Sequence, residues 1–114
     1  MHGDWKLGNL GAHPDGRTIL LDWAFPGAGP GCADLAWYLG VNCARMAMTK
    51  ESAIDRYRQG LERHGVRTEP WWDAQLGLCL IGHFLQMGWN KAMHGRDDEL
   101  IWWEQRVLDA ERYL

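Results

Sequence analysis

The chain has 114 residues and a formal net charge of −3, so it fits one modest domain and offers no basic patch for nucleic acid. Hydrophobic residues make up 46% of it and charged residues 24%, a composition that excludes a largely disordered chain. Eight tryptophans, which are costly to expose, predict a core or a pocket rich in indole rings.

Three features of the sequence bear on the compartment of the protein. The three cysteines form no C-x-x-C pair, which argues against a disulfide framework or a zinc site. The segment from Met1 to Asp4 lacks the basic and apolar regions of a signal peptide. The longest apolar stretch, residues 76–89, is too short and too polar to span a membrane. We therefore expect a cytoplasmic protein with no membrane partner.

The first part of the chain predicts a loop and a hairpin. Residues 1–9 show no hydrophobic period and contain glycines, as in a loop. An extended piece at residues 9–10, a Pro-Asp-Gly turn at residues 14–16 and an apolar piece at residues 18–21 predict a β-hairpin. Residues 24–33 contain two prolines and three glycines and are expected to be irregular.

Two helices are predicted after this loop. The first opens at Asp34, because an acidic residue favours a helix N-terminus, and Leu35 and Leu39 lie on its inner face. The second has Thr49 as its N-cap and ends at Gly65, which tolerates the backbone conformation that follows a helix.

Two further helices complete the chain. The third is predicted from Thr68 and Pro70 to about Met93, and it is apolar nearly all round over residues 76–85. We therefore expect it to be the central, buried helix. The fourth starts at a solvated acidic segment, residues 97–99. Its inner stripe is predicted to contain Leu100, Trp103, Val107 and Leu114.

Aromatic residues on these helices give two more predictions. Adjacent tryptophans at 71–72 and at 102–103 point to different helix faces, so one of each pair is expected in the core. His83 lies on the apolar third helix and is expected to be a core histidine whose hydrogen bonds are satisfied.

The predicted fold class is mainly α with a small β-hairpin (α+β). We expect a single domain over residues 1–114. Residues 1–33 form its loop-and-hairpin part, and residues 34–114 form a helical subdomain.

A set of polar residues in the first 22 positions is the strongest functional signal. His2-Gly3-Asp4 is followed by Asn9, and the hairpin ends at Asp22. Phosphoryl transfer from ATP needs one carboxylate to orient the attacking hydroxyl and accept its proton. It also needs a second carboxylate and an amide oxygen to hold magnesium against the phosphates. Hard oxygen ligands of this kind suit Mg²⁺. The hairpin folds Asp22 back beside the loop that carries Asp4 and Asn9, so the spacing suits this chemistry.

Three segments in this order resemble the aminoglycoside phosphotransferase and choline kinase superfamily. They read His2-Gly3-Asp4-x-x-x-x-Asn9, then Ile-Leu-Leu-Asp-Trp at 19–23, then Asp-Leu-Ala at 34–36. The resemblance covers residues 2–39, and the remainder matches only as an all-helical tail. It implies the C-terminal lobe of the protein-kinase-like fold. It also implies transfer of the γ-phosphate of ATP to a small-molecule hydroxyl, with Mg²⁺ as the metal.

The resemblance also implies a role for each matched residue. Asp4 corresponds to the catalytic base, and Asn9 and Asp22 correspond to the magnesium ligands. His2 structures the catalytic loop. Asp34, at the start of its helix, hydrogen-bonds that loop from beneath.

Three positions bear on whether the chain is closer to small-molecule kinases or to protein kinases. Gly3 replaces the arginine of the protein-kinase motif, and Trp23 stands where that family has Phe-Gly, so both favour a small-molecule kinase. Lys6 instead resembles the protein-kinase loop and is a candidate contact for the transferring phosphate. A protein-kinase remnant is therefore a third, weaker hypothesis.

Kinases of this fold also have an N-terminal lobe, with a phosphate-covering loop and a lysine that grips the phosphates. No strand-rich segment precedes His2, and the glycines at 27, 29 and 31 lack the G-x-G-x-x-G spacing. We therefore expect a fragment without the N-lobe, with little or no activity by itself. Its expected partners are a small-molecule hydroxyl substrate and either the missing N-lobe or a second copy bound through the exposed lobe face.

Other interpretations of the same residues stay open at this point. Asp4, Asn9 and Asp22 are also typical of ordinary turns, and Asp34 of a helix cap. The second hypothesis for the chain is a non-catalytic interaction module, a truncated fragment that associates through an exposed apolar face. Aminoglycosides, macrolides, choline, homoserine and sugar-like compounds are all open as substrates, because acceptor recognition in this superfamily lies in variable helices.

Overall fold

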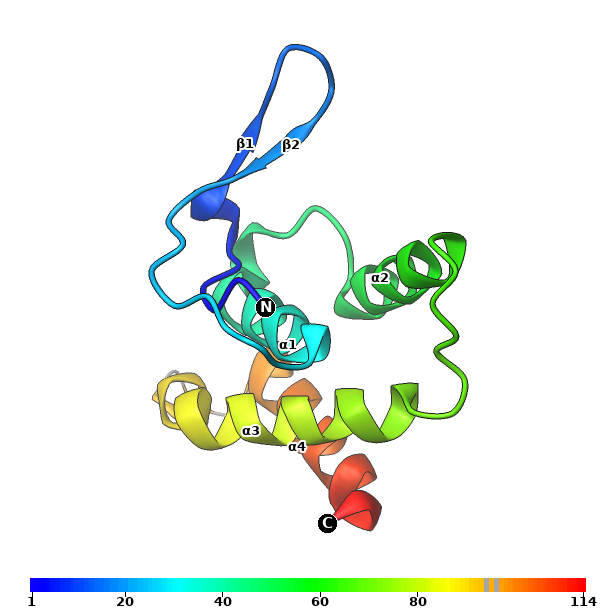
Figure 1. Cartoon of the computed structure of the whole chain (residues 1–114). Helices are drawn as coiled ribbons and strands as arrows, with labels where there is room; N and C mark the ends of the chain where they lie inside the picture. The colour runs from blue at the N-terminus through cyan, green and yellow to red at the C-terminus, as the bar shows by residue number, and fades with distance from the viewer. Residues whose placement is uncertain (94, 96) are drawn as a thin grey trace.

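A computed structural model describes residues 1–93, 95 and 97–114 and shows a mainly helical chain with one small sheet (Figure 1). Its strands are β1 (Leu10–Ala12) and β2 (Thr18–Leu20). Its α-helices are α1 (Gly31–Val41), α2 (Lys50–Arg63), α3 (Trp72–Ala92) and α4 (Asp98–Ala110). Short 3-10 turns occupy Leu7–Asn9, Cys43–Arg45 and Glu111–Tyr113. The predicted fold class, mainly α with a small hairpin, is confirmed.

The hairpin forms where the sequence predicts it and stands away from the helices (Figure 1). Its antiparallel strands pair Leu10 with Leu20 and Ala12 with Thr18. The turn closes through hydrogen bonds from the His13 N–H to the Arg17 carbonyl and from the Gly16 N–H to the His13 carbonyl, both 2.9 Å. Gly16 has a φ of +87°, which a glycine adopts without strain.

Two of the predicted helix starts are confirmed by their caps. The Thr49 side chain accepts a hydrogen bond from the Ser52 N–H at the start of α2, and Asp97 accepts one from the Leu100 N–H at the start of α4. Each cap satisfies a backbone donor that the first helical turn leaves free.

The other two helix starts were predicted wrongly. Helix α1 begins at Gly31 rather than Asp34, because Pro30 takes the extended N-cap position and the helix follows directly. Helix α3 begins at Trp72 rather than near Thr68. The Thr68 side chain is buried and donates to Glu62 at 2.5 Å instead of capping a helix, while its carbonyl accepts the Trp71 and Trp72 N–H groups in a turn.

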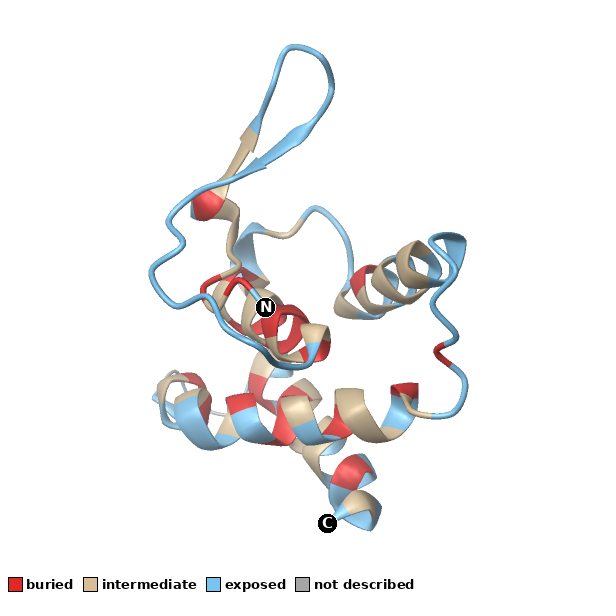
Figure 2. Cartoon of the chain, in the orientation of Figure 1, coloured by how far each residue is buried: buried red, intermediate tan, exposed pale blue. Residues whose placement is uncertain are grey.

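Helix α3 packs between α1 and α4, and the core lies among these helices (Figures 1 and 2). Leu35, Leu39 and Trp103 are almost completely buried. Burial of each such leucine contributes about 1.5–3 kcal/mol to folding. Trp72 and Trp103 are the buried members of the two tryptophan pairs, as predicted.

Two predictions about burial are wrong. Helix α3 is not buried all round, since Leu78 and Leu85 are exposed on the side that neither α1 nor α4 covers. Leu114 is also exposed, because α4 ends at Ala110 and a 3-10 turn carries the last residues away from the stripe.

Glu99 lies inside the helical layer rather than on a solvated helix start. Its carboxylate accepts a hydrogen bond from Trp103 at 2.8 Å and pairs with Lys50 and, at 3.2 Å, with Lys91. Lys91 also donates to the Gly40 carbonyl at 2.6 Å. Burial alone would raise the pKa of Glu99, but the Lys50 and Trp103 hydrogen bonds and the two lysine charges lower it overall. This cluster joins all four α-helices.

No helix in the described part of the chain is both long and apolar enough to cross a bilayer.

Candidate functional site

Asp34 anchors the segment His2–Asn9, which we call the N-terminal loop. Its carboxylate accepts the backbone N–H groups of His2 at 2.6 Å and Gly3 at 2.8 Å. The side chain is buried in the first turn of α1. Hydrogen bonds to a buried carboxylate are stronger than those between neutral groups, so α1 holds the start of the loop firmly. The family resemblance implies a contact of this kind for Asp34.

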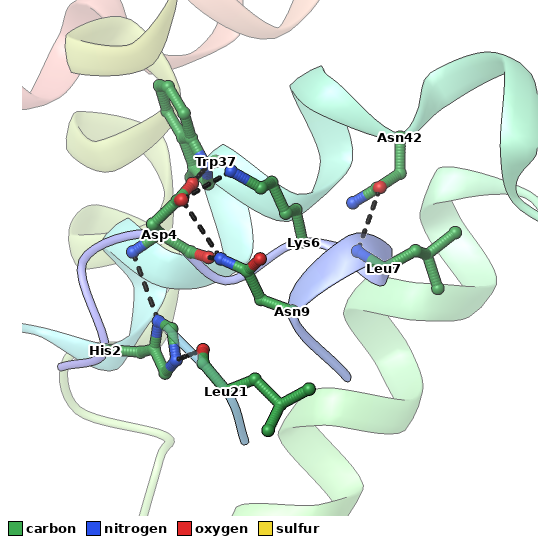
Figure 3. Close-up of polar contacts among 8 residues, drawn as sticks. All are labelled: His2, Asp4, Lys6, Leu7, Asn9, Leu21, Trp37 and Asn42. Atoms are coloured by element: carbon green, nitrogen blue, oxygen red, sulfur yellow. Dashed lines mark hydrogen bonds and ion pairs between the residues drawn. The ribbon is translucent and has the colours of Figure 1, made fainter. Parts of the chain in front are cut away.

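Asp4 is surrounded by hydrogen-bond donors (Figure 3). Its Oδ2 accepts from Lys6 Nζ at 2.5 Å and from Asn9 Nδ2 at 3.0 Å, and its Oδ1 accepts from Trp37 Nε1 at 2.9 Å. The Lys6 hydrogen bond lowers the pKa of Asp4 most, against an opposing effect of burial, and the Trp37 and Asn9 bonds add to it. Asp4 is therefore a fixed, ionised carboxylate at neutral pH.

Asn9 closes the N-terminal loop on itself. Its side-chain nitrogen donates to both the carbonyl and the carboxylate of Asp4, at 2.9 and 3.0 Å. The amide oxygen of Asn9 takes no part in these two bonds. The five-residue spacing between Asp4 and Asn9 thus brings the Asn9 side chain against Asp4.

Leu21, the residue before Asp22, is hydrogen-bonded to the N-terminal loop (Figure 3). The Leu21 N–H donates to the Asn9 carbonyl, and the Leu21 carbonyl pairs with His2 Nε2, both at 2.9 Å. Asp22 itself is exposed and has a φ of +57°. A left-handed backbone at a residue other than glycine is uncommon and often marks a functional position.

Two residues of this site were missed by the sequence analysis. Trp37 lies three residues after Asp34 on α1, so both side chains reach the loop from one helix face, Trp37 by its bond to Asp4. Asn42, just after α1, is almost completely buried and accepts the Leu7 N–H at 3.1 Å. A buried polar residue on the core side of a helix was the signal for Asn42, and the spacing from Asp34 was the signal for Trp37.

Two hollows flank the N-terminal loop. The first, of about 590 Å³, lies under the hairpin and is lined mainly by apolar and aromatic side chains, among them Trp5, Trp23 and Tyr57. The second, of about 500 Å³, lies between the loop and α3 and is lined by Gly3, Trp37 and His83 among others. Asp34 lines both hollows. A small molecule therefore has room on either side of the loop.

Carboxylate and amide oxygens are the ligand types that a hard cation takes. Among the described residues, no three His, Cys, Asp or Glu side chains converge as a metal-binding group. The two residues that the resemblance implies as ligands, Asp22 and Asn9, carry a carboxylate and an amide oxygen, and Asp22 is exposed. Mg²⁺ is commonly bound by one or two such groups, with water and substrate phosphates completing its shell.

Comparisons of this chain with family models, with curated proteins and with solved structures returned no match.

Proposed function

We propose that this chain is the C-terminal, catalytic portion of a Mg²⁺- and ATP-dependent small-molecule phosphotransferase, with the corresponding lobe of the protein-kinase-like fold. The observation that supports this most is the Asp4 carboxylate, held ionised by Lys6, Asn9 and Trp37. Three donors around one partly buried carboxylate exceed what a turn residue needs. They suit a group that must stay in one orientation.

In the proposed reaction Asp4 accepts a hydrogen bond from the substrate hydroxyl and takes its proton as the phosphate is transferred. A low pKa makes Asp4 a weak base, but the loose transition state of phosphoryl transfer asks mainly for orientation of the nucleophile. Asn9 and Asp22 would hold magnesium through an amide oxygen and a carboxylate. When bound, the metal neutralises charge on the phosphates.

Lys6 has a second use in this proposal. Its ammonium group pairs with Asp4 at 2.5 Å, and its side chain is 38% exposed. A lysine in this position can turn toward an incoming phosphate while staying near the carboxylate. We place the reaction in the cytoplasm, where ATP is supplied.

A thermal-shift titration with Mg²⁺-ATP tests the proposal through binding, so it does not depend on turnover. A ligand present at a hundredfold over its Kd stabilises a protein by about 2.7 kcal/mol. We expect this stabilisation in the parent chain, and we expect it to disappear in Asp22→Asn. Asparagine tolerates the left-handed backbone at this position, so the substitution removes charge without adding strain.

Asp55→Asn is the matched control, because Asp55 is an exposed carboxylate on α2 and its substitution changes the net charge equally. The control is expected to respond to Mg²⁺-ATP like the parent. The proposal fails if the parent melts cooperatively and shows no shift, or if the Asp22 and Asp55 variants respond alike.

A non-catalytic interaction module is the second candidate. Its support is the segment that follows the hairpin, where Leu21, Trp23 and Phe25 are all exposed. Exposed apolar side chains so close together are typical of association surfaces. A cooperative melt without any nucleotide response would favour this candidate.

A further inference from the structure

Helix α3 presents a continuous apolar stripe to the outside, which we call the α3 stripe. It consists of Leu78, Gly82, Leu85 and Trp89, together with Met93, the C-cap residue directly after α3. These positions repeat at intervals of three and four residues, so they lie on one helix face. Leu85 is 79% exposed, Met93 is 73% and Trp89 is 61%. The stripe spans about 22 Å at the rise of an α-helix.

The α3 stripe also lacks charge. Residues 78–93 contain one charged side chain, that of Lys91. Lys91 is buried against Gly40 and Glu99 and does not face outward. Gln86 is the polar residue of the exposed face. Solvent-facing helices normally carry charged side chains, and loss of charge at a surface patch is typical of the centre of a protein interface.

The order of residues in the α3 stripe fits a second copy of itself. An antiparallel partner related by a two-fold axis between residues 85 and 86 places Leu78 opposite the partner's Met93 and Gly82 opposite the partner's Trp89. A side chain at Gly82 would meet nothing within 4 Å, so the surface is open there. Each indole therefore faces a gap on the other copy, and the arrangement occurs twice.

We propose that two copies of this chain associate through antiparallel packing of their α3 stripes. Such an interface is isologous: the same patch is used on both copies, and it closes as a dimer. No like charges meet across the stripe, although each chain carries a net charge of −3. One helix pair buries little area, so the expected dissociation constant is on the order of tens of micromolar. The α3 stripe adjoins the candidate site, because Gly82 also lines the second hollow beside Gly3 and Asp34. Self-association is nevertheless measured without nucleotide or turnover, so its failure and that of the phosphotransferase function are distinguishable.

Sedimentation equilibrium of the full chain, from about 10 to about 500 µM, tests the proposal. A monomer–dimer equilibrium is expected for the parent. Leu85→Glu puts two carboxylates near the two-fold axis, and Gly82→Leu fills the gap that receives Trp89. Each is expected to weaken the dimer by about tenfold or more.

The Gly82→Leu chain is expected to fold normally, because a Cβ at this position meets nothing within 4 Å and leucine favours a helix over glycine. A loss of dimer in this variant therefore does not come from misfolding. Leu108→Glu, an exposed substitution on α4, is the control and should dimerise like the parent. A parent chain that stays monomeric over the whole range overturns the proposal. So does a dimer that Leu85→Glu and Gly82→Leu leave unchanged.

The antiparallel direction has its own test. Leu78→Glu alone is expected to weaken the dimer, and adding Met93→Lys to the same chain is expected to restore it, because the two new charges then meet across the interface. In a parallel pair each new charge would face its own copy. A double variant that dimerises no better than Leu78→Glu therefore excludes the antiparallel arrangement.

Discussion

The carboxylates at the N-terminal loop and the histidine His83, which lies among helices α1, α3 and α4, are held in different ways. At the loop, hydrogen bonds hold the carboxylates: Asp34 of α1 accepts two backbone N–H groups of the loop, and Asp4 accepts three side-chain donors. In the layer, His83 is equally buried, yet its Nε2 atom has no hydrogen-bond partner among the described residues. This unpaired nitrogen corrects the prediction of a core histidine whose hydrogen bonds are all satisfied, and the rings of Trp37 and Trp103 pack around His83. Hydrogen bonds fix the orientation of a side chain, whereas packing limits the space that it can occupy.

Trp37 belongs to both regions. Its Nε1 donates to Asp4, while its ring packs edge-on against His83 with centroids 5.6 Å apart. His83 in turn lies 4.9 Å from the ring of Trp103. The packing around His83 therefore positions Trp37, one of the three donors to Asp4. Substitutions in the two regions compare how much packing and hydrogen bonding each contribute to the free energy of unfolding.

The largest effect is expected from Gly40→Ala, which changes volume only. A Cβ at Gly40 would lie 1.9 Å from His83 Nε2, and His83 cannot retreat because Trp37 and Trp103 pack against its ring. Overpacking of this kind should lower the free energy of unfolding by about 3 kcal/mol, measured by urea denaturation.

Gly60→Ala on α2 is the control for this substitution, since its Cβ would meet only the tip of Arg63 at 4.0 Å. It is expected to stabilise the chain by about 0.5–1 kcal/mol through helix propensity. Equal effects at the two glycines would show that the packing around His83 is loose.

A smaller loss is expected from Asp34→Asn, which changes hydrogen bonding with little change of volume. Asparagine keeps one acceptor oxygen, so only one of the His2 and Gly3 N–H groups stays paired. Loss of a charged hydrogen bond at a buried site should lower the free energy of unfolding by about 2 kcal/mol. Asp55→Asn, on the exposed face of α2, should stay within about 0.5 kcal/mol of the parent. If both variants unfold alike, the anchoring role of Asp34 is wrong.

The comparison also explains which features the sequence could predict. Hairpin, caps and core tryptophans follow from local rules about turns, N-caps and hydrophobic period, so they appear where expected at Gly16, Thr49, Asp97 and Trp103. The contact of Asp34 with the loop was predicted from resemblance, and its geometry agrees. The magnesium and catalytic roles stay predictions.

Features that depend on distant partners could not be predicted. The sequence predicts that Glu99 belongs to a solvated helix start. Its carboxylate instead pairs with Lys50 of α2 and Lys91 of α3, and these contacts form only when the helices pack together. The lack of a partner for His83 depends on Gly40, which brings backbone rather than a donor or acceptor side chain next to its ring. The exposed side of α3 could not be predicted either. A helix that is apolar all round has no polar face, so its sequence does not indicate which side faces solvent.

The smallest effect is a pH dependence of stability at His83. Burial, together with the nearby charge of Lys91 and against that of Glu99, lowers the pKa of His83 from 6.5 to about 4. Between these values the unfolded chain binds a proton at this residue that the folded chain does not, so stability falls as the pH falls from 6.5 toward 4. From pH 6 to pH 5 the loss should be about 1 kcal/mol.

The effect of His83 is isolated by comparing urea denaturation of the parent with that of His83→Leu at both pH values. Leucine is apolar, so it leaves no unpaired nitrogen beside Gly40, and Lys91 and Glu99 remain to titrate as before. The difference in stability between the two chains should shift by about 1 kcal/mol in favour of the variant at pH 5. A difference that does not change with pH would mean that His83 already finds a partner or reaches water. The helical layer would then hold its histidine as the loop holds Asp4, by hydrogen bonds.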